Sequence, residues 1–234
     1  VAGEGGACCC GGDDRWGWGV SVAWLYCSSL PPMTQYDLKI PKPDYKALIF
    51  DLDGTLVDSM PAHFKAWCKA LEDQGQPGVF PEDVFYAMGG RPTRDIVEVI
   101  NGEQGLSLDA DQVASSKKRH YLKNLSLVEL IPAVAKIAEE NRGKVRLAVA
   151  SGSSREVVEK TLQVLGISDW FDEVVSSDEV PNGKPAPDVF LEAASRIEIA
   201  PEDCVVFEDA RSGIIAARAA GMEVVAVPTH LHLD

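Results

Sequence analysis

The stretch Lys-Ala-Leu-Ile-Phe-Asp-Leu-Asp-Gly-Thr-Leu-Val-Asp-Ser, residues 46–59, decides the fold of this chain. Ala47 to Phe50 is an apolar run that suits a strand buried on both faces. It ends at Asp51, and Gly54 then interrupts the pattern as a turn does. In an extended chain the carboxylates of Asp51 and Asp53 point the same way and repel, unless a cation such as Mg²⁺ lies between them. A strand followed by an acidic turn would also explain a bare Asp-x-Asp.

The overall composition restricts the partners of this protein. Its 234 residues suit one domain with an insertion or two small domains, and 46% hydrophobic residues suffice for a core. A net charge of −14 argues against nucleic acid and anionic membranes as partners. The cysteines are scattered, and no metal-ligand spacing occurs after residue 32, so we expect a cytoplasmic protein. We also expect a monomer.

Residues 1–32 differ from the rest because they are rich in Gly, Cys and Trp. The apolar run 20–27 is too short to span a bilayer, and acidic residues precede it where a signal peptide has cations. Met33 would suit a natural start. We therefore interpret residues 1–32 as a disordered or non-native extension with no part in the fold.

A helical pattern follows the first strand. One face of the first helix carries apolar residues at the spacing i, i+3, i+4, i+7 and i+8, namely His63, Ala66, Trp67, Ala70 and Leu71. Three further helices are indicated near 81–88, from 92 and near 109–125, and no strand is predicted between Ser59 and Ile131. Residues 60–130 are therefore expected to form an all-helical cap domain.

From Pro132 the chain alternates between helix and strand patterns. Strands are predicted at 145–150, 171–175, 204–207 and 224–227, with helices at 132–141 and 156–165, from 187, and at 214–220. Such alternation predicts right-handed βαβ units and a parallel sheet. We expect residues 33–59 and 131–234 to form a doubly wound, Rossmann-like α/β core.

Polar residues follow the second strand, where parallel sheets bind ligands. Ser151 offers a hydroxyl there, and Gly152 lets the backbone approach a phosphate oxygen. Ser153 and Glu156 have the spacing of a capping box, which predicts a helix start with free amides. An ordinary capped turn would carry the same residues.

Charged residues complete the candidate site. Glu208 and Asp209 follow a buried strand, and a metal shared with Asp51 and Asp53 would account for their charges. Two prolines stiffen the backbone after Lys184, so its ammonium group can be held in one place, although a lone lysine is more often solvated.

In this order, these segments resemble the signatures of the haloacid dehalogenase superfamily, and most closely its β-phosphoglucomutase-like group. The matching motifs are Asp-x-Asp-Gly-Thr-Leu-Val-Asp-Ser at 51–59, Asp-Ser-x-x-x-His-Phe-Lys-Ala-Trp at 58–67, Lys-Pro-Ala-Pro-Asp at 184–188 and Glu-Asp-Ala-x-x-Gly at 208–213. The resemblance implies that Asp51 attacks phosphorus and that Asp53 acts as acid and base. It implies Mg²⁺ as cofactor, and catalytic or phosphate-binding roles for Ser151, Gly152, Ser153 and Lys184.

The cap residues bear on the substrate. The resemblance places His63 near Asp53 and aligns Lys117 with a cap lysine that reaches the substrate, although Lys117 would also suit a solvated face. Arg91 lies in the segment where mutases of the group carry an arginine, but Pro92 occupies the aligned position. The Gly-x-Pro-Thr form at 90–93 instead resembles bacterial sugar-phosphate phosphatases, including fructose-1-phosphate phosphatase.

We therefore expect a Mg²⁺-dependent phosphatase that acts on a small sugar phosphate. A β-phosphoglucomutase is the alternative from within the same group. A non-catalytic binding module is a further alternative, because fold does not fix function.

Overall fold

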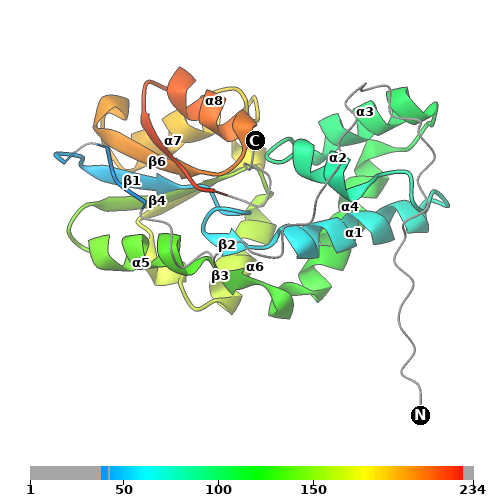
Figure 1. The fold of residues 1–234 in the computed structure, drawn as a ribbon, viewed down its shortest axis with the longest axis horizontal. Helices are drawn as coiled ribbons and strands as arrows, with labels where there is room; N and C mark the ends of the chain where they lie inside the picture. Colours follow the sequence, from blue (N-terminus) through cyan, green and yellow to red (C-terminus); the bar gives the residue numbers. More distant parts are fainter. Residues whose placement is uncertain (1–37, 42, 229–234) are drawn as a thin grey trace, which may run out of the picture.

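The structure is a computed structural model, and it describes residues 38–41 and 43–228. Residues 1–32, interpreted above as an extension, lie outside this part of the chain. No helix of the described part is long and apolar enough to cross a bilayer. A five-stranded sheet lies at the centre of the core domain (Figure 1), and its strands run in the order β5-β4-β1-β6-β7.

The strands of this sheet are parallel, as the alternating pattern predicted. They are β1 (Ala47–Phe50), β4 (Arg146–Ser151), β5 (Glu173–Ser176), β6 (Cys204–Glu208) and β7 (Glu223–Ala226). β1 has the predicted ends, and the ends of the other strands lie within two residues of the predicted ones. β1 is central because it pairs with β4 on one side and with β6 on the other.

Helices cover both faces of the sheet. They are α5 (Pro132–Asn141), α6 (Arg155–Val164), α7 (Asp188–Arg196) and α8 (Arg211–Ala219). Leu48 and Phe50 pack toward α5 and α6, whereas Ala47 and Ile49 pack toward α7 and α8. Alternate residues of β1 thus enter opposite hydrophobic clusters, which explains why the strand is apolar throughout. The doubly wound α/β core is confirmed. Short 3₁₀ turns complete the connections at η2 (Leu125–Leu127), η3 (Ser168–Trp170), η4 (Ser177–Glu179) and η5 (Pro201–Asp203).

Four helices form the cap region beside the core (Figure 1). They are α1 (Met60–Asp73), α2 (Glu82–Ala87), α3 (Thr93–Gln104) and α4 (Ala110–Lys123). They share a separate hydrophobic cluster that includes Trp67, Phe80, Phe85 and Ile100. The helical cap was therefore predicted correctly, while its boundaries at 60 and 130 stay a prediction.

A small second sheet joins the two segments that connect cap and core. β2 (Val57–Asp58) pairs antiparallel with β3 (Glu129–Leu130). The prediction that no strand lies between Ser59 and Ile131 is therefore wrong. Strands of two residues carry no detectable alternation, so the sequence pattern could not indicate them.

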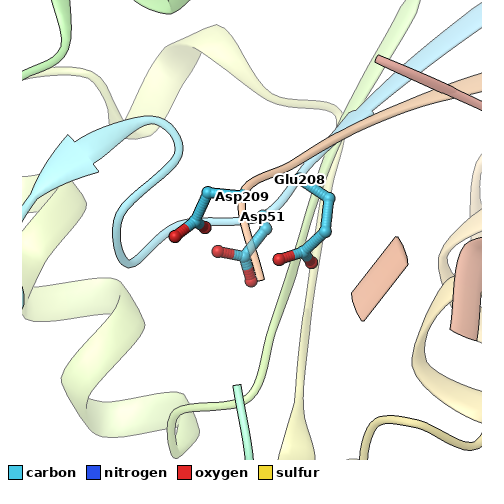
Figure 2. Close-up of side chains that lie close together, drawn as sticks. All are labelled: Asp51, Glu208 and Asp209. Carbon is cyan, nitrogen blue, oxygen red and sulfur yellow. The ribbon is translucent and has the colours of Figure 1, made fainter. Parts of the chain in front are cut away.

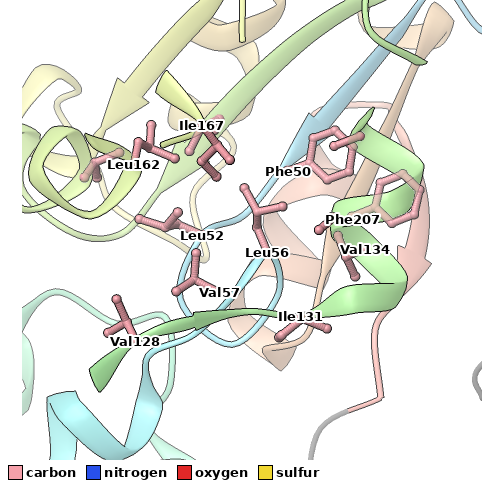
Figure 3. Packing of buried hydrophobic residues seen from close by; sticks show 14 of the residues in the cluster. Phe50, Leu52, Leu56, Val57, Val128, Ile131, Val134, Leu162, Ile167 and Phe207 are labelled. Atoms are coloured by element: carbon pink, nitrogen blue, oxygen red, sulfur yellow. The ribbon is translucent and has the colours of Figure 1, made fainter. Parts of the chain in front are cut away.

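The loop after β1 is fixed by a tight turn and by hydrophobic packing. The Leu52 carbonyl accepts hydrogen bonds from the backbone amides of Thr55, Leu56 and Val57, at 3.4, 3.1 and 2.9 Å. The side chains of Leu52, Leu56 and Val57 are buried in the cluster beneath the sheet, close to Ile131 (Figure 3). The acidic loop therefore rests on the hydrophobic core.

Truncating Leu56 to alanine should remove part of this support. A buried Leu→Ala change costs about 2–5 kcal/mol in the free energy of unfolding, which urea denaturation measures. The matched control is Leu127→Ala, because Leu127 is 59% exposed and its change should cost less than about 0.5 kcal/mol. Equal losses in the two variants would contradict the packing described here.

Candidate active site

Three carboxylates converge at the carboxyl ends of β1 and β6 (Figure 2). Asp51 directly follows β1, Glu208 ends β6, and Asp209 is the next residue. Each offers one oxygen atom, and these atoms all lie within 4.8 Å of one another. All three residues are buried. The sequence predicted that these carboxylates lie close together, because the two parallel strands end at the same edge of the sheet.

Lys184 balances part of this charge. Its Nζ donates hydrogen bonds of 2.6 Å to Asp51 Oδ1 and to Glu208 Oε2. The residue is only 2% exposed, and its Nζ lies 4.8 Å from the centre of the Phe190 ring. The second Glu208 oxygen accepts a hydrogen bond of 2.9 Å from the backbone amide of Ala210. Lys184 is therefore not a solvated surface residue.

The electrostatics of this cluster favour a further cation. Burial raises the pKa of the Asp51 carboxyl well above its usual range, and the Glu208 charge adds to this effect. Burial likewise raises the pKa of Asp209 to about 7. Burial by itself would lower the pKa of the Lys184 ammonium group. The Asp51 and Glu208 carboxylates have the larger, opposite effect, so the pKa is raised. When ionised, the three buried carboxylates carry more negative charge than one ammonium group can balance. Their oxygen atoms are suitable ligands for a divalent ion such as Mg²⁺.

Two glycines leave room for these carboxylates. Gly54 has a φ of +91°, and a Cβ at this position would lie 2.5 Å from Asp209 Oδ2. A Cβ at Gly213, in the first turn of α8, would overlap Glu208 Oε2. Thr55 Oγ1 also donates a hydrogen bond of 2.7 Å to Asp209 Oδ1. Sequence reasoning did not single out Thr55, although it lies within the deciding stretch 46–59.

Asp53 is not one of the three carboxylates that lie within 4.8 Å of one another. Ser59 Oγ and His63 Nε2 contact its Oδ1 at 2.6 and 2.9 Å, and Ser153 Oγ donates to its Oδ2 at 2.7 Å. Burial opposes ionisation, but His63 and the two hydroxyls lower the pKa of Asp53. Asp51 and Asp53 line the same cavity, and the Asp53 charge contributes to the raised pKa of Asp51. Whether their carboxylates share one cation stays a prediction.

The predicted capping box at the start of α6 does not form. The N-cap is Ser154, and it makes no side-chain cap bond. Ser153 Oγ bonds to Asp53 instead, and Glu156 pairs with Lys118 and Lys160. The sequence spacing was suitable for a capping box, but partners from distant segments hold both side chains.

Two amides in this segment already have partners. The backbone amide of Ser153 donates to Ser151 Oγ at 3.0 Å, and that of Arg155 donates to the Asp178 carboxylate at 3.0 and 3.2 Å. The Ser151 hydroxyl accepts this bond and keeps its own proton to donate. Gly152 lines the same cavity as Asp51 and Asp53. Ser151, Gly152 and Ser153 are thus grouped beside the acidic loop, while their role in phosphate binding stays a prediction.

The cap supplies the opposite wall of this cavity, whose volume is about 720 Å³. His63, Arg91 and Lys117 all line it. Lys117 Nζ lies 5.5 Å from the centre of the Trp67 ring, and burial lowers the pKa of its ammonium group to about 8. The Arg91 guanidinium has no ion-pair partner within the described part of the chain. The predicted cap residues therefore face the predicted catalytic residues.

The cap is closed over the core in this structure. Ser212 Oγ donates a hydrogen bond of 3.0 Å to the carbonyl of Gly89. A Cβ at Gly152 would lie 3.1 Å from the Gly90 carbonyl oxygen, and one at Gly183 would lie 2.7 Å from Pro92 Cγ. Cap residues 89–92 therefore contact the first turn of α8 and the loops that contain Gly152 and Gly183.

Gly213→Ala should weaken Mg²⁺ binding, because the new methyl group displaces the Glu208 carboxylate and with it Lys184. Saturating Mg²⁺ should raise the Tm of the wild-type chain by several degrees and that of Gly213→Ala by much less. Gly102→Ala is the matched control, since a Cβ there meets nothing within 4 Å and alanine favours the helix. An equal rise in all three proteins would contradict this account.

Comparisons with known proteins agree with this geometry. Residues 48–227 match the family model described as haloacid dehalogenase-like hydrolase. The chain is 40% identical to the fructose-1-phosphate phosphatase YqaB of Escherichia coli, over 78% of this chain and 96% of the relative. It is 31% identical to the β-phosphoglucomutase of Bacillus subtilis, over 78% and 83% of the two chains.

A solved structure also shares the fold. CbbY from Rhodobacter sphaeroides, crystallised with phosphate, superimposes with a TM-score of 0.74 over 81% of this chain and 90% of that one, at 23% identity. The chain therefore belongs to the haloacid dehalogenase-like hydrolases, in the group that contains β-phosphoglucomutase and sugar phosphatases, and is a phosphoric monoester hydrolase.

Proposed function

We propose that this protein hydrolyses a small sugar phosphate, of the fructose 1-phosphate kind, through an aspartyl-phosphate at Asp51. The observation that carries the proposal is the position of Lys184, whose ammonium group contacts Asp51 in a buried site that opens into the cavity under the cap. An ammonium group so placed offsets the repulsion between an anionic nucleophile and an anionic phosphate. The E. coli relative bears the name of a fructose-1-phosphate phosphatase.

In the first step, an Asp51 carboxylate oxygen forms a bond to phosphorus while the bond from phosphorus to the sugar oxygen breaks. Asp53 gives its proton to the leaving oxygen. The lowered pKa of Asp53 holds it ionised in the free enzyme, but a phosphate bound nearby adds negative charge and raises that pKa again. Ser151, Gly152 and Ser153 hold the phosphate oxygens.

In the second step, water attacks phosphorus and the bond to Asp51 breaks, so that inorganic phosphate leaves. Asp53 accepts the proton of this water, and its contacts with Ser59, His63 and Ser153 suit the ionised form that this role requires. Exclusion of bulk water by the closed cap protects the intermediate until this step.

The proposed cofactor is Mg²⁺, held by Asp51, Glu208, Asp209 and Asp53. Once bound, it supplies positive charge that stabilises the charge developing on the transferred phosphoryl group. The raised pKa values of Asp51 and Asp209 support a cation at this place.

The substrate proposal rests on the cap wall. Arg91 and Lys117 provide positive charge in the cavity, and the buried Trp67 ring packs behind the Lys117 ammonium group. Pro92 stands where mutases of the group carry an arginine, and this favours hydrolysis over transfer within the sugar. The main alternative is a β-phosphoglucomutase. The Bacillus relative favours it, and so does the Arg91 guanidinium, which has no ion-pair partner among residues 38–41 and 43–228.

Phosphate release from a panel of sugar phosphates, with and without Mg²⁺, tests the proposal. We expect Mg²⁺-dependent release from fructose 1-phosphate, and a loss of about 1,000-fold or more in kcat for Asp51→Asn. Asp44→Asn is the control, because Asp44 is exposed and does not line the cavity. Unchanged release by Asp51→Asn would refute the proposed nucleophile.

Product analysis with β-glucose 1-phosphate separates the two activities. A phosphatase releases glucose and inorganic phosphate in equal amounts, because water accepts the phosphoryl group. Formation of glucose 6-phosphate without net phosphate release would instead establish the mutase.

A further inference from the structure

Two rings of the cap lie against each other next to Asp53. His63 belongs to α1 and Tyr121 to α4, and both residues are buried. Their ring centres are 3.9 Å apart and their planes differ by 4°, which is a parallel stack. Tyr121 therefore covers one face of the imidazole.

Each ring also makes hydrogen bonds with residues outside the cap, and the Tyr121 hydroxyl interacts with Ser59 as well as with Thr161. His63 Nε2 lies 2.9 Å from Asp53 Oδ1, and the Tyr121 hydroxyl lies 3.2 Å from Thr161 Oγ1 in α6. Thr161 already donates its single hydroxyl proton to the carbonyl of Val157, at 2.8 Å. The Tyr121 hydroxyl is therefore the donor, and Thr161 is its acceptor.

His63 has few other polar contacts that could fix its ring. Its Nδ1 is buried and has no hydrogen-bond partner within the described part of the chain. A single hydrogen bond at Nε2 leaves the ring free to tilt about that bond. The flat face of Tyr121, itself tied to the core through Thr161, removes this freedom.

We infer that Tyr121 is a positioning residue for the reaction: its ring sets the plane of His63, and its hydroxyl locks that arrangement to the core helix α6, so that His63 holds Asp53 in place. The inference rests on the proposed phosphatase function. Tyr121 acts through His63 and takes no part in bond making at phosphorus.

The first test compares Tyr121→Leu with Tyr121→Phe, using p-nitrophenyl phosphate and saturating Mg²⁺. Leucine removes the stacked ring, so kcat should fall about tenfold with KM changed less than about twofold. Phenylalanine keeps the stack and loses only the hydroxyl, so kcat should fall about threefold. An unchanged kcat in Tyr121→Leu would overturn the inference.

A double-mutant cycle with His63→Ala distinguishes positioning from a general structural role. If Tyr121 acts through His63, then Tyr121→Leu should cost less than about twofold in kcat once His63 is gone. A similar loss with and without His63 would overturn the inference. A wild-type enzyme that hydrolyses no phosphate ester at all would instead refute the proposed function.

Thr161→Val covers the case in which Tyr121→Leu does not fold. Valine has nearly the same shape as threonine but cannot accept the Tyr121 proton. The kcat of Thr161→Val should fall about threefold. The double variant Thr161→Val, Tyr121→Phe should be no slower than either single variant, because both changes remove the same hydrogen bond. Losses that multiply, or full activity in Thr161→Val, would overturn the inference.

Discussion

The ammonium group of Lys184 lies between the carboxylates of Asp51 and Glu208, and all three groups are buried. Taken out of water alone, any of these charges would cost several kcal/mol. A pair of opposite charges at about 4 Å gains on the order of 4 kcal/mol at an effective dielectric constant near 20. Glu208 thus fixes the lysine, and the lysine fixes the nucleophile.

The rest of the fold maintains this arrangement. The parallel sheet brings the ends of β1 and β6 together, and hydrophobic side chains below the acidic loop hold the turn after β1 (Figure 3). Gly54 and Gly213 leave the space that the Asp209 and Glu208 side chains occupy. The cap then closes over the site through residues 89–92.

The sequence predicted what depends on local pattern and strand order. Apolar runs located β1 and β6, and the polar residues at their ends indicated the carboxylate cluster. It did not predict the three amides that bond to the Leu52 carbonyl, because this turn depends on backbone hydrogen bonds within the loop. Nor did it predict the bonds of Ser153 to Asp53 and of Tyr121 to Thr161, which join segments far apart in the chain. Such pairs leave no periodic signal in the sequence.

Chemical trapping of the phosphorylated carboxylate tests the central claim most directly. An aspartyl-phosphate formed during turnover can be quenched in acid and reduced with borohydride, which converts that aspartate to homoserine. Peptide mass spectrometry should then find homoserine at position 51 only in samples that received both substrate and Mg²⁺. Homoserine at another carboxylate, or none during steady turnover, would contradict the account.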